Sequence, residues 1–143
     1  MGENYESGGA GVVSSVDDYV RFLEAFRTGK LISDEARELM ITSKLTVEQL
    51  SDYGIKSIGY GYGLGVRCPL TPDSRSTSIG WGGAAAAHLG CDIKKGITYY
   101  YAQHVLGSPN QAMRNDIAFL IEEDLGIEEK ETESVVYKEK LTY

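Results

Sequence analysis

Apolar residues recur every three or four positions near the start of the chain, which is the spacing of an amphipathic helix. Ser15 stands just before this stretch and is followed by two aspartates, the arrangement of an N-cap with acidic side chains at the positive end of a helix dipole. We therefore predict a helix from Val16 to about Arg27, with Gly29 as its stop. Its apolar stripe consists of Val16, Tyr19, Val20, Leu23 and Phe26.

Three further helical segments follow from the same rules. A second helix is predicted from Ser33 to near Ser43, and one more helical turn within residues 45–53. A last helix over residues 109–125 begins with the N-cap and first-position proline of Ser108-Pro109-Asn110-Gln111 and closes at Gly126.

The middle of the chain has the patterns of strands. Residues 59–66 alternate glycine with Tyr60, Tyr62, Leu64 and Val66, which predicts one strand with a bare glycine face. Residues 97–105 are rich in β-branched and aromatic side chains and predict a second strand, joined by a hairpin over 92–96 to a third strand over 84–92. The four alanines at 84–87 favour helix by propensity, but the strand over 97–105 needs a partner.

Together these elements indicate an α+β fold, in which helices cover an antiparallel sheet of about three or more strands. The chain of 143 residues has the length of one domain, which we place at residues 1–126, followed by a charged tail over 127–143. Glycine, at 17 residues, is enriched and clusters at 8–11, 59–65 and 80–83, which indicates close packing of backbone.

Charge and composition exclude several classes of function. The formal net charge of −7 argues against nucleic acid and anionic membranes as partners. No stretch is apolar enough to span a membrane, and the first residues lack the regions of a signal peptide. The two cysteines form no disulfide framework, so the sequence does not indicate a compartment.

A search for catalytic and metal-binding patterns finds no complete site. No serine stands in S-x-x-K or G-x-S-x-G, and no tyrosine stands in Y-x-N. His88 and His104 lack an obvious orienting carboxylate for a general base. Four residues are of types that bind zinc, namely Cys68, His88, Cys91 and His104, but their spacing is too irregular to favour a metal site. No cofactor is expected.

Three segments, taken in order, resemble the serine β-lactamase-like family, which groups class C β-lactamases, D-alanyl-D-alanine carboxypeptidases and related esterases. The first runs from Glu6 to Leu23 and contains E-S-G-G-A-G-V-V-S-S-V-D-D-Y. The second is G-Y-G-Y-G-L-G-V over 59–66. The third is G-W-G-G-A-A over 80–85, followed by Asp92 and the turn to Gly96. The resemblance extends over residues 6 to about 125.

The resemblance implies which residues line a site. The family's third motif, K-T-G or a variant on the strand beside the cleft, corresponds to Trp81-Gly82-Gly83. The backbone N–H of Ala84 corresponds to one of two oxyanion-hole donors. Because Trp81 replaces the lysine, the motif itself supplies no positive charge for a carboxylate, which favours the esterase-like branch.

Two hypotheses about function follow. In the first, the chain is the C-terminal portion of a serine hydrolase acting on a small ester, β-lactam or D-Ala-D-Ala peptide, inactive alone because it lacks the first two motifs. In the second, it is a non-catalytic binding or assembly module derived from that fold. Its partner would be the missing N-terminal half or a second copy of itself, since open sheet edges seek partners.

Overall fold

The computed structural model describes residues 7–9, 11–52, 60–69, 78–107 and 113–127. Its first helix, α1 (Val16–Arg27), has the predicted bounds, and Ser15 Oγ accepts the N–H of Asp18 at 3.1 Å as the expected N-cap. Gly29 follows the helix with a φ of +72°, the left-handed conformation that ends helices. The prediction for this helix is confirmed.

Helices α2 (Asp34–Ile41) and α3 (Val47–Asp52) follow, also as predicted, although α2 ends two residues earlier than expected. Ser33 caps α2 by accepting the N–H of Ala36. Before α3, Thr46 and Gln49 form a reciprocal capping box, each side chain accepting the other's backbone N–H. These local bonds explain why short helices of ordinary propensity form here.

Within the described residues, five strands form one antiparallel sheet whose spatial order is the order of the chain, β1-β2-β3-β4-β5, which confirms the predicted α+β class. The bounds of the strands are β1 (Tyr60–Tyr62), β2 (Arg67–Pro69), β3 (Ser78–Gly82), β4 (His88–Asp92) and β5 (Ile97–Tyr101). The hairpin predicted between the last two is confirmed: Gly96 N–H donates to the Asp92 carbonyl, and Lys95 N–H donates to the Asp92 carboxylate.

Three strand predictions are wrong in their bounds. Residues 59–66 are not one strand, because the chain reverses after Tyr62: Gly63 N–H donates to the Val66 carbonyl, and Gly65 has a φ of +77°. Residues 83–87 form a turn, so the strand over 84–92 begins only at His88. The last strand ends at Tyr101, four residues before its predicted end.

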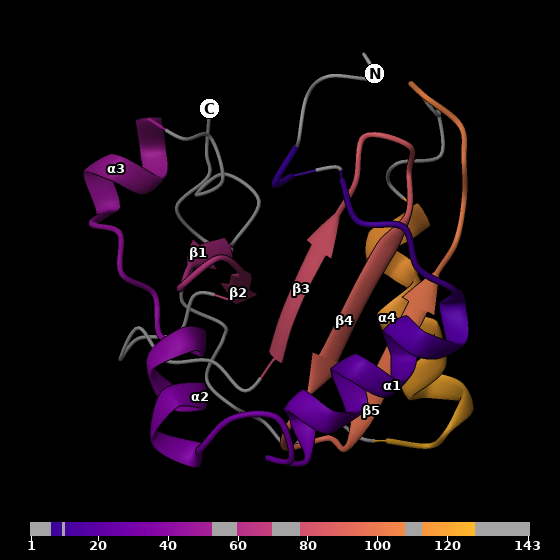
Figure 1. Ribbon diagram of the computed structural model, residues 1–143, viewed down its shortest axis with the longest axis horizontal. Helices are drawn as coiled ribbons and strands as arrows, with labels where there is room; N and C mark the ends of the chain where they lie inside the picture. Colours follow the sequence, from indigo (N-terminus) through magenta and orange to yellow (C-terminus); the bar gives the residue numbers. More distant parts are fainter. Residues whose placement is uncertain (1–6, 10, 53–59, 70–77, 108–112, 128–143) are drawn as a thin grey trace.

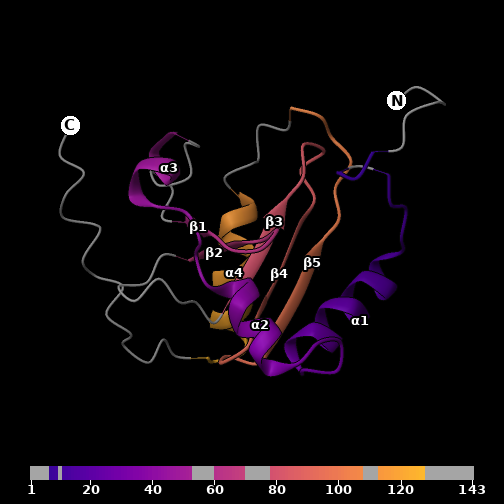
Figure 2. The same ribbon diagram turned by 60° about the vertical axis from the view of Figure 1, so that its left-hand side comes forward.

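The two faces of the sheet carry different layers. Figures 1 and 2 show α1 on one face of β4 and β5, and α4 (Met113–Asp124) on the opposite face. On the α1 side, the paired residues Ile79 and Cys91 pack with Phe26 of α1 and Ile41 of α2 in a buried cluster. Burial of these apolar side chains is the main force that holds the helices on the sheet.

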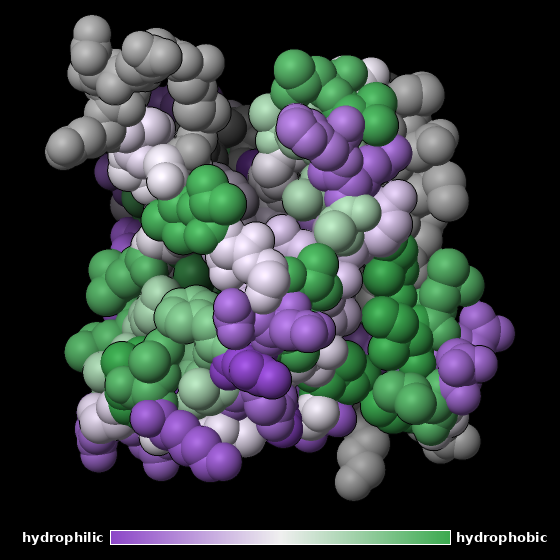
Figure 3. Space-filling model, turned by 45° about the vertical axis from the view of Figure 1, so that its right-hand side comes forward, coloured by the Kyte–Doolittle hydropathy of each residue, from purple (hydrophilic) through white to green (hydrophobic). Residues whose placement is uncertain are grey.

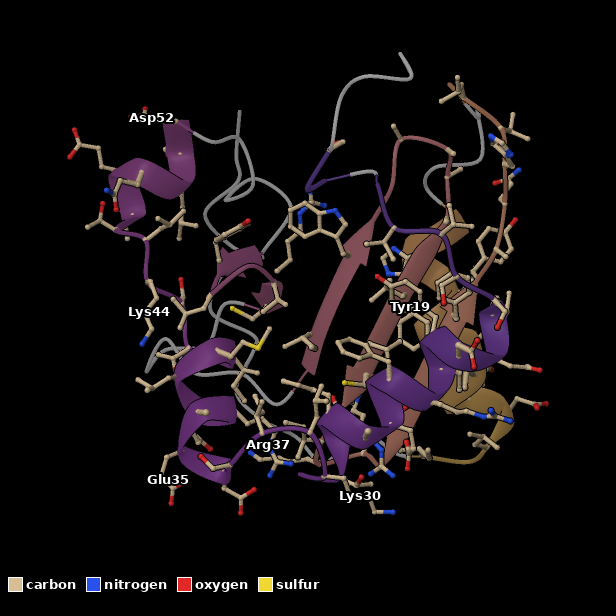
Figure 4. The ribbon with its side chains drawn as sticks, viewed as in Figure 1. Tyr19, Lys30, Glu35, Arg37, Lys44 and Asp52 are labelled. Atoms are coloured by element: carbon tan, nitrogen blue, oxygen red, sulfur yellow. The ribbon has the colours of Figure 1, made fainter. Side chains whose placement is uncertain are left out.

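Three sets of polar contacts described below join the helices to the sheet or to one another. Glu24 of α1 accepts from both Arg27 (2.9 and 2.6 Å) and Thr98 of β5 (2.8 Å). Arg37 extends from α2 to the C-terminal end of α1, where it donates to the carbonyls of Phe26 and Arg27 (Figure 4).

The third contact is an ion pair of 2.6 Å between Lys95, in the β4–β5 turn, and Glu122 of α4. The acidic run over 122–124 would by itself predict a solvated helix face. Glu123 and Asp124 are exposed in agreement with this, whereas Glu122 is largely buried in its ion pair. Gly126 closes α4 with a φ of +63°, as predicted. The start of this helix at 108–112 and the tail over 128–143 lie outside the described residues. Among the described helices, none is long and apolar enough to cross a membrane.

Candidate functional site: the open end of β3

The segment that corresponds to the family's third motif lies at the end of β3 and in the turn that follows it. Trp81 and Gly82 are the last two residues of the strand. In the turn, Gly83 N–H donates to the Ala87 carbonyl at 2.9 Å, and Ala86 N–H donates to the Gly83 carbonyl at 3.0 Å. This is a three-residue hairpin loop, and its third residue, Ala86, takes the left-handed φ of +67° that such loops require.

One edge of β3 is open at this end. Toward β4, the strand is paired along its whole length, from Ser78↔Asp92 to Gly82↔His88. Toward β2, the only described pairing is Arg67↔Gly80. Within the described strands, the edge at Trp81 and Gly82 thus has backbone groups that no neighbouring strand occupies, the kind of edge along which an extended ligand can bind.

Ala84 lies at the exposed tip of the turn. Its neighbours Gly83 and Ala86 donate within the turn, whereas no acceptor for Ala84 N–H is found among the described residues. A backbone N–H held in a fixed turn and free to donate has the property an oxyanion-hole donor needs. The role of Ala84 as that donor stays a prediction.

Trp81 is in contact with two side chains of the β1–β2 hairpin. The ring of Tyr62 meets the indole edge to face, with ring centroids 5.9 Å apart. The guanidinium carbon of Arg67 lies 4.8 Å from the centroid of the Trp81 ring, within cation–π distance. A positive charge therefore lies beside the third-motif strand, although the motif contains no lysine.

Arg67 is not among the site residues predicted from the sequence. No periodicity links residue 67 to residue 81, and the continuous strand predicted over 59–66 left no reason to bring them together. The one available signal was that the alternation of glycine with larger side chains over residues 59–66 ends just before Arg67, which indicates a change in direction of the chain.

On the sheet face opposite Trp81, His88 and Tyr99 form a second side-chain pair. Their rings are stacked, with centroids 5.7 Å apart, and His88 Nε2 lies 3.2 Å from the Tyr99 hydroxyl. The register sets His88 beside Gly82, but its side chain is on the other side of the sheet from the indole. This arrangement joins β4 and β5, and the Tyr99 hydroxyl also lies near Gly80 of β3.

The structure does not bring the four zinc-type ligands together. Cys68 and Cys91 are buried free thiols, and burial raises the pKa of each to about 11, so neither ionises near neutrality. Cys91 and His88 face opposite sides of β4, and His104 is exposed beyond β5. Within the described part of the chain, no three residues of metal-ligating type form a group that could hold an ion.

Comparison with known proteins agrees with this fold. Neither a protein-family model nor a curated protein sequence matches the chain. Among solved structures, it is similar to EstCE1, described as a hydrolase with promiscuous acyltransferase activity, with 22% identity over 80% of this chain and a TM-score of 0.61. It is also similar to unliganded simvastatin synthase (LovD) from Aspergillus terreus, with 20% identity over 76% of this chain and a TM-score of 0.60.

Both structures have the serine β-lactamase-like fold, and the fold expected from the sequence resemblance is confirmed. The chain spans about a third of the length of either protein, 32% and 34%. This partial coverage fits the expected C-terminal portion of the fold.

Proposed function

We propose that the chain forms one wall of the active-site cleft of a serine hydrolase or acyltransferase, and that the nucleophile comes from a part of the fold outside these 143 residues. The observation that carries the proposal is the open edge of β3 at Trp81 and Gly82, together with the N–H of Ala84 in the turn that follows, for which no acceptor is found among the described residues. The absence of S-x-x-K and Y-x-N from the sequence is consistent with a nucleophile supplied from elsewhere.

The proposed chemistry is acyl transfer. An acyl group lies along the open edge of β3, and its carbonyl oxygen accepts the N–H of Ala84. When the nucleophile attacks, negative charge develops on that oxygen. The fixed N–H dipole then stabilises the charge more strongly than it stabilises the uncharged carbonyl, which lowers the barrier.

The first test is made on the chain alone. Without a paired nucleophile and base, the purified chain forms no acyl-enzyme, so we expect no labelling by a fluorophosphonate and no hydrolysis of p-nitrophenyl butyrate or a chromogenic cephalosporin. Labelling of any serine in the native chain, with turnover that the label abolishes, contradicts the proposal.

The second test concerns Ala84 in the protein that carries this chain together with S-x-x-K and Y-x-N segments, which the coding sequence upstream of residue 1 should reveal. Ala84 is the second residue of its turn, a position that accepts proline without strain. Ala84→Pro therefore removes the N–H while keeping the turn, and we expect kcat to fall by about 10²–10³. Ala84→Ser keeps the N–H and serves as the matched control. Equal activity of the proline and serine variants overturns the assignment.

A second candidate function is a non-catalytic assembly module. It is favoured by the edge strands: β1 and β5 each have one neighbour among the described strands. Several large apolar side chains also reach the surface, among them Val13 and Leu106, and Figure 3 shows such patches between hydrophilic ones. Size-exclusion chromatography with light scattering tests this candidate, since a strict monomer at high concentration counts against self-association.

A further inference from the structure

Helix α4 contributes little to the core of the described part of the chain. The buried apolar cluster lies on the side of the sheet that carries α1, whereas α4 lies on the opposite face (Figure 1). Among the α4 side chains that the structure describes, none is buried, and Leu120 is 60% exposed. An ion pair between Glu122 and Lys95 attaches the helix to the β4–β5 turn. The helix therefore keeps apolar side chains at the surface.

Four described residues of α4 line an open groove of about 430 Å³, namely Ile117, Leu120, Ile121 and Asp124. They stand at positions i, i+3, i+4 and i+7 of the helix, so they form one stripe along its length, which we call the α4 stripe. At about 100° per residue, Glu122 lies about 150° round the helix from the middle of this stripe. Since Glu122 contacts the β4–β5 turn, the α4 stripe points away from that turn.

The spacing of the α4 stripe is that of a surface that binds another helix. Side chains at three- and four-residue intervals form ridges, and the grooves beside them accept the ridges of a second helix. Recognition of an amphipathic helix by an apolar groove uses the same spacing of anchor residues. A small molecule fits less well, because an open groove covers it on one side only.

Charge indicates which kind of helix fits. Glu123 and Asp124 are exposed next to the apolar side chains of the α4 stripe, and neither has an ion-pair partner among the described residues. A second copy of the chain, with its net charge of −7, would bring the same carboxylates against them, and like charges that face each other across an interface lower affinity. A helix with lysine or arginine beside its apolar face pairs with both carboxylates instead.

We infer that the α4 stripe is a docking site for an amphipathic helix of a partner protein, with basic side chains along the edge of its apolar face. Ile117, Leu120 and Ile121 bury the apolar side chains of the partner, and Glu123 and Asp124 pair with its basic ones. Burial of apolar surface supplies affinity, and the carboxylates set the choice of partner. The inference does not depend on the proposed function, because the α4 stripe and the open edge of β3 lie on different elements.

The test measures binding of two short peptides to the chain by fluorescence anisotropy. The first peptide consists only of leucine and lysine, with leucines at positions i, i+3, i+4 and i+7 and a fluorescein label at one end. In the second, glutamate replaces each lysine, so the apolar face is the same and the charge is reversed. We expect saturable binding of the lysine peptide, with a Kd at least about tenfold lower than that of the glutamate peptide, and weaker binding as salt is raised.

Two variants of α4 locate the binding on the stripe. Leu120→Gln should raise the Kd of the lysine peptide by about tenfold or more, because a leucine side chain is no longer buried against it. Asp124→Lys should remove the preference for the lysine peptide. Leu39→Gln on α2 and Asp52→Lys at the end of α3 make the same changes at exposed positions of other helices, and these controls should bind as the wild type does.

Equal affinity for the two peptides overturns the inference, and so does unchanged binding by the Leu120→Gln or the Asp124→Lys variant. Self-association of the chain that Leu120→Gln abolishes, measured by light scattering, makes a second copy the occupant and also overturns it. Since the four substituted side chains are exposed, each variant should keep the fold, which circular dichroism checks. The effect of Ala84→Pro on kcat is independent of all these outcomes, so this inference and the proposed function fail separately.

Discussion

The ring of Tyr99 lies across the Cα of Gly90 on the neighbouring strand, and it can do so only because Gly90 has no side chain. A Cβ built on Gly90 would overlap the hydroxyl and ring atoms of Tyr99. The two residues are directly paired between β4 and β5. The glycine thus creates the space in which Tyr99 turns inward to stack on His88.

Substitution of Gly90 should expel this ring. We expect Gly90→Ala to lower the free energy of unfolding by about 1–3 kcal/mol, the usual cost of overpacking, because either Tyr99 leaves His88 or the strands separate locally. Urea denaturation measures the change. Gly9→Ala is the control, since nothing lies near a Cβ at Gly9, and it should stay within about 0.5 kcal/mol. Equal stability of the two variants would show that Tyr99 moves away at no cost.

Ala86 provides a second prediction, in which three effects nearly cancel. Its left-handed φ of +67° costs about 1–2 kcal/mol in a residue with a Cβ. Ala86→Gly relieves this strain, but it gives up a fully buried methyl group, worth about 0.8 kcal/mol, and adds about 0.4–1 kcal/mol of unfolded-state entropy. We therefore expect Ala86→Gly to be nearly neutral.

Ala86→Val should instead destabilise by about 2 kcal/mol or more. A β-branched residue is a genuine outlier at positive φ, and because Ala86 is fully buried, two more methyl groups would have to displace its neighbours. Ala84→Val, at the exposed tip of the same turn, is the matched control. Thermal unfolding compares the three variants, and a valine tolerated at 86 as well as at 84 would contradict the strain argument.

The third prediction concerns acid stability. Hydrogen bonds from Arg27 and then from Thr98 lower the pKa of Glu24 from 4.5 to about 2. A group with a lowered folded-state pKa contributes stability above its unfolded pKa and loses it as the pH falls. The contribution of Glu24 should thus be complete above about pH 5 and should disappear between pH 4.5 and 2.

Because the Glu24 side chain is 44% exposed, solvent screening reduces this contribution to the order of 1 kcal/mol. Glu24→Gln should be less stable than the wild type by that amount at pH 7 and equally stable near pH 2. Chemical denaturation across this range measures both, with the exposed Glu123→Gln as control. A difference that persists unchanged at pH 2 would mean that the carboxylate charge is not its source.

The helices could be predicted well from the sequence because their determinants are local. Ser15 and Ser33 cap helices within three residues of themselves, and Gly29 and Gly126 end helices by their own backbone conformation. The class of fold followed from the same periodicities. The position of the third-motif strand followed from the resemblance, since local rules alone leave residues 78–92 ambiguous between helix and strand.

The sheet was harder to predict because glycine has two uses that look alike in a sequence. Alternating glycines can line a strand face, but Gly63 and Gly65 instead let the chain turn against the backbone of α2, where Leu64 N–H donates to the Met40 carbonyl. The candidate functional site was also hard to predict, because its contacts join residues that are distant in the sequence. The contact between Arg67 and Trp81 joins residues on separate strands, and no local pattern contains that information.

The spatial order of the described strands has a consequence for how this part of the protein acquires its structure. Strands β3, β4 and β5 are joined by a five-residue and a four-residue connection, so each finds its partner next to itself along the chain. Closing such short loops costs little entropy, and sheets of low contact order form rapidly. The strands that hold Trp81 and Gly82, and the turn that holds Ala84, can therefore assemble early, before contacts between distant parts of the chain form.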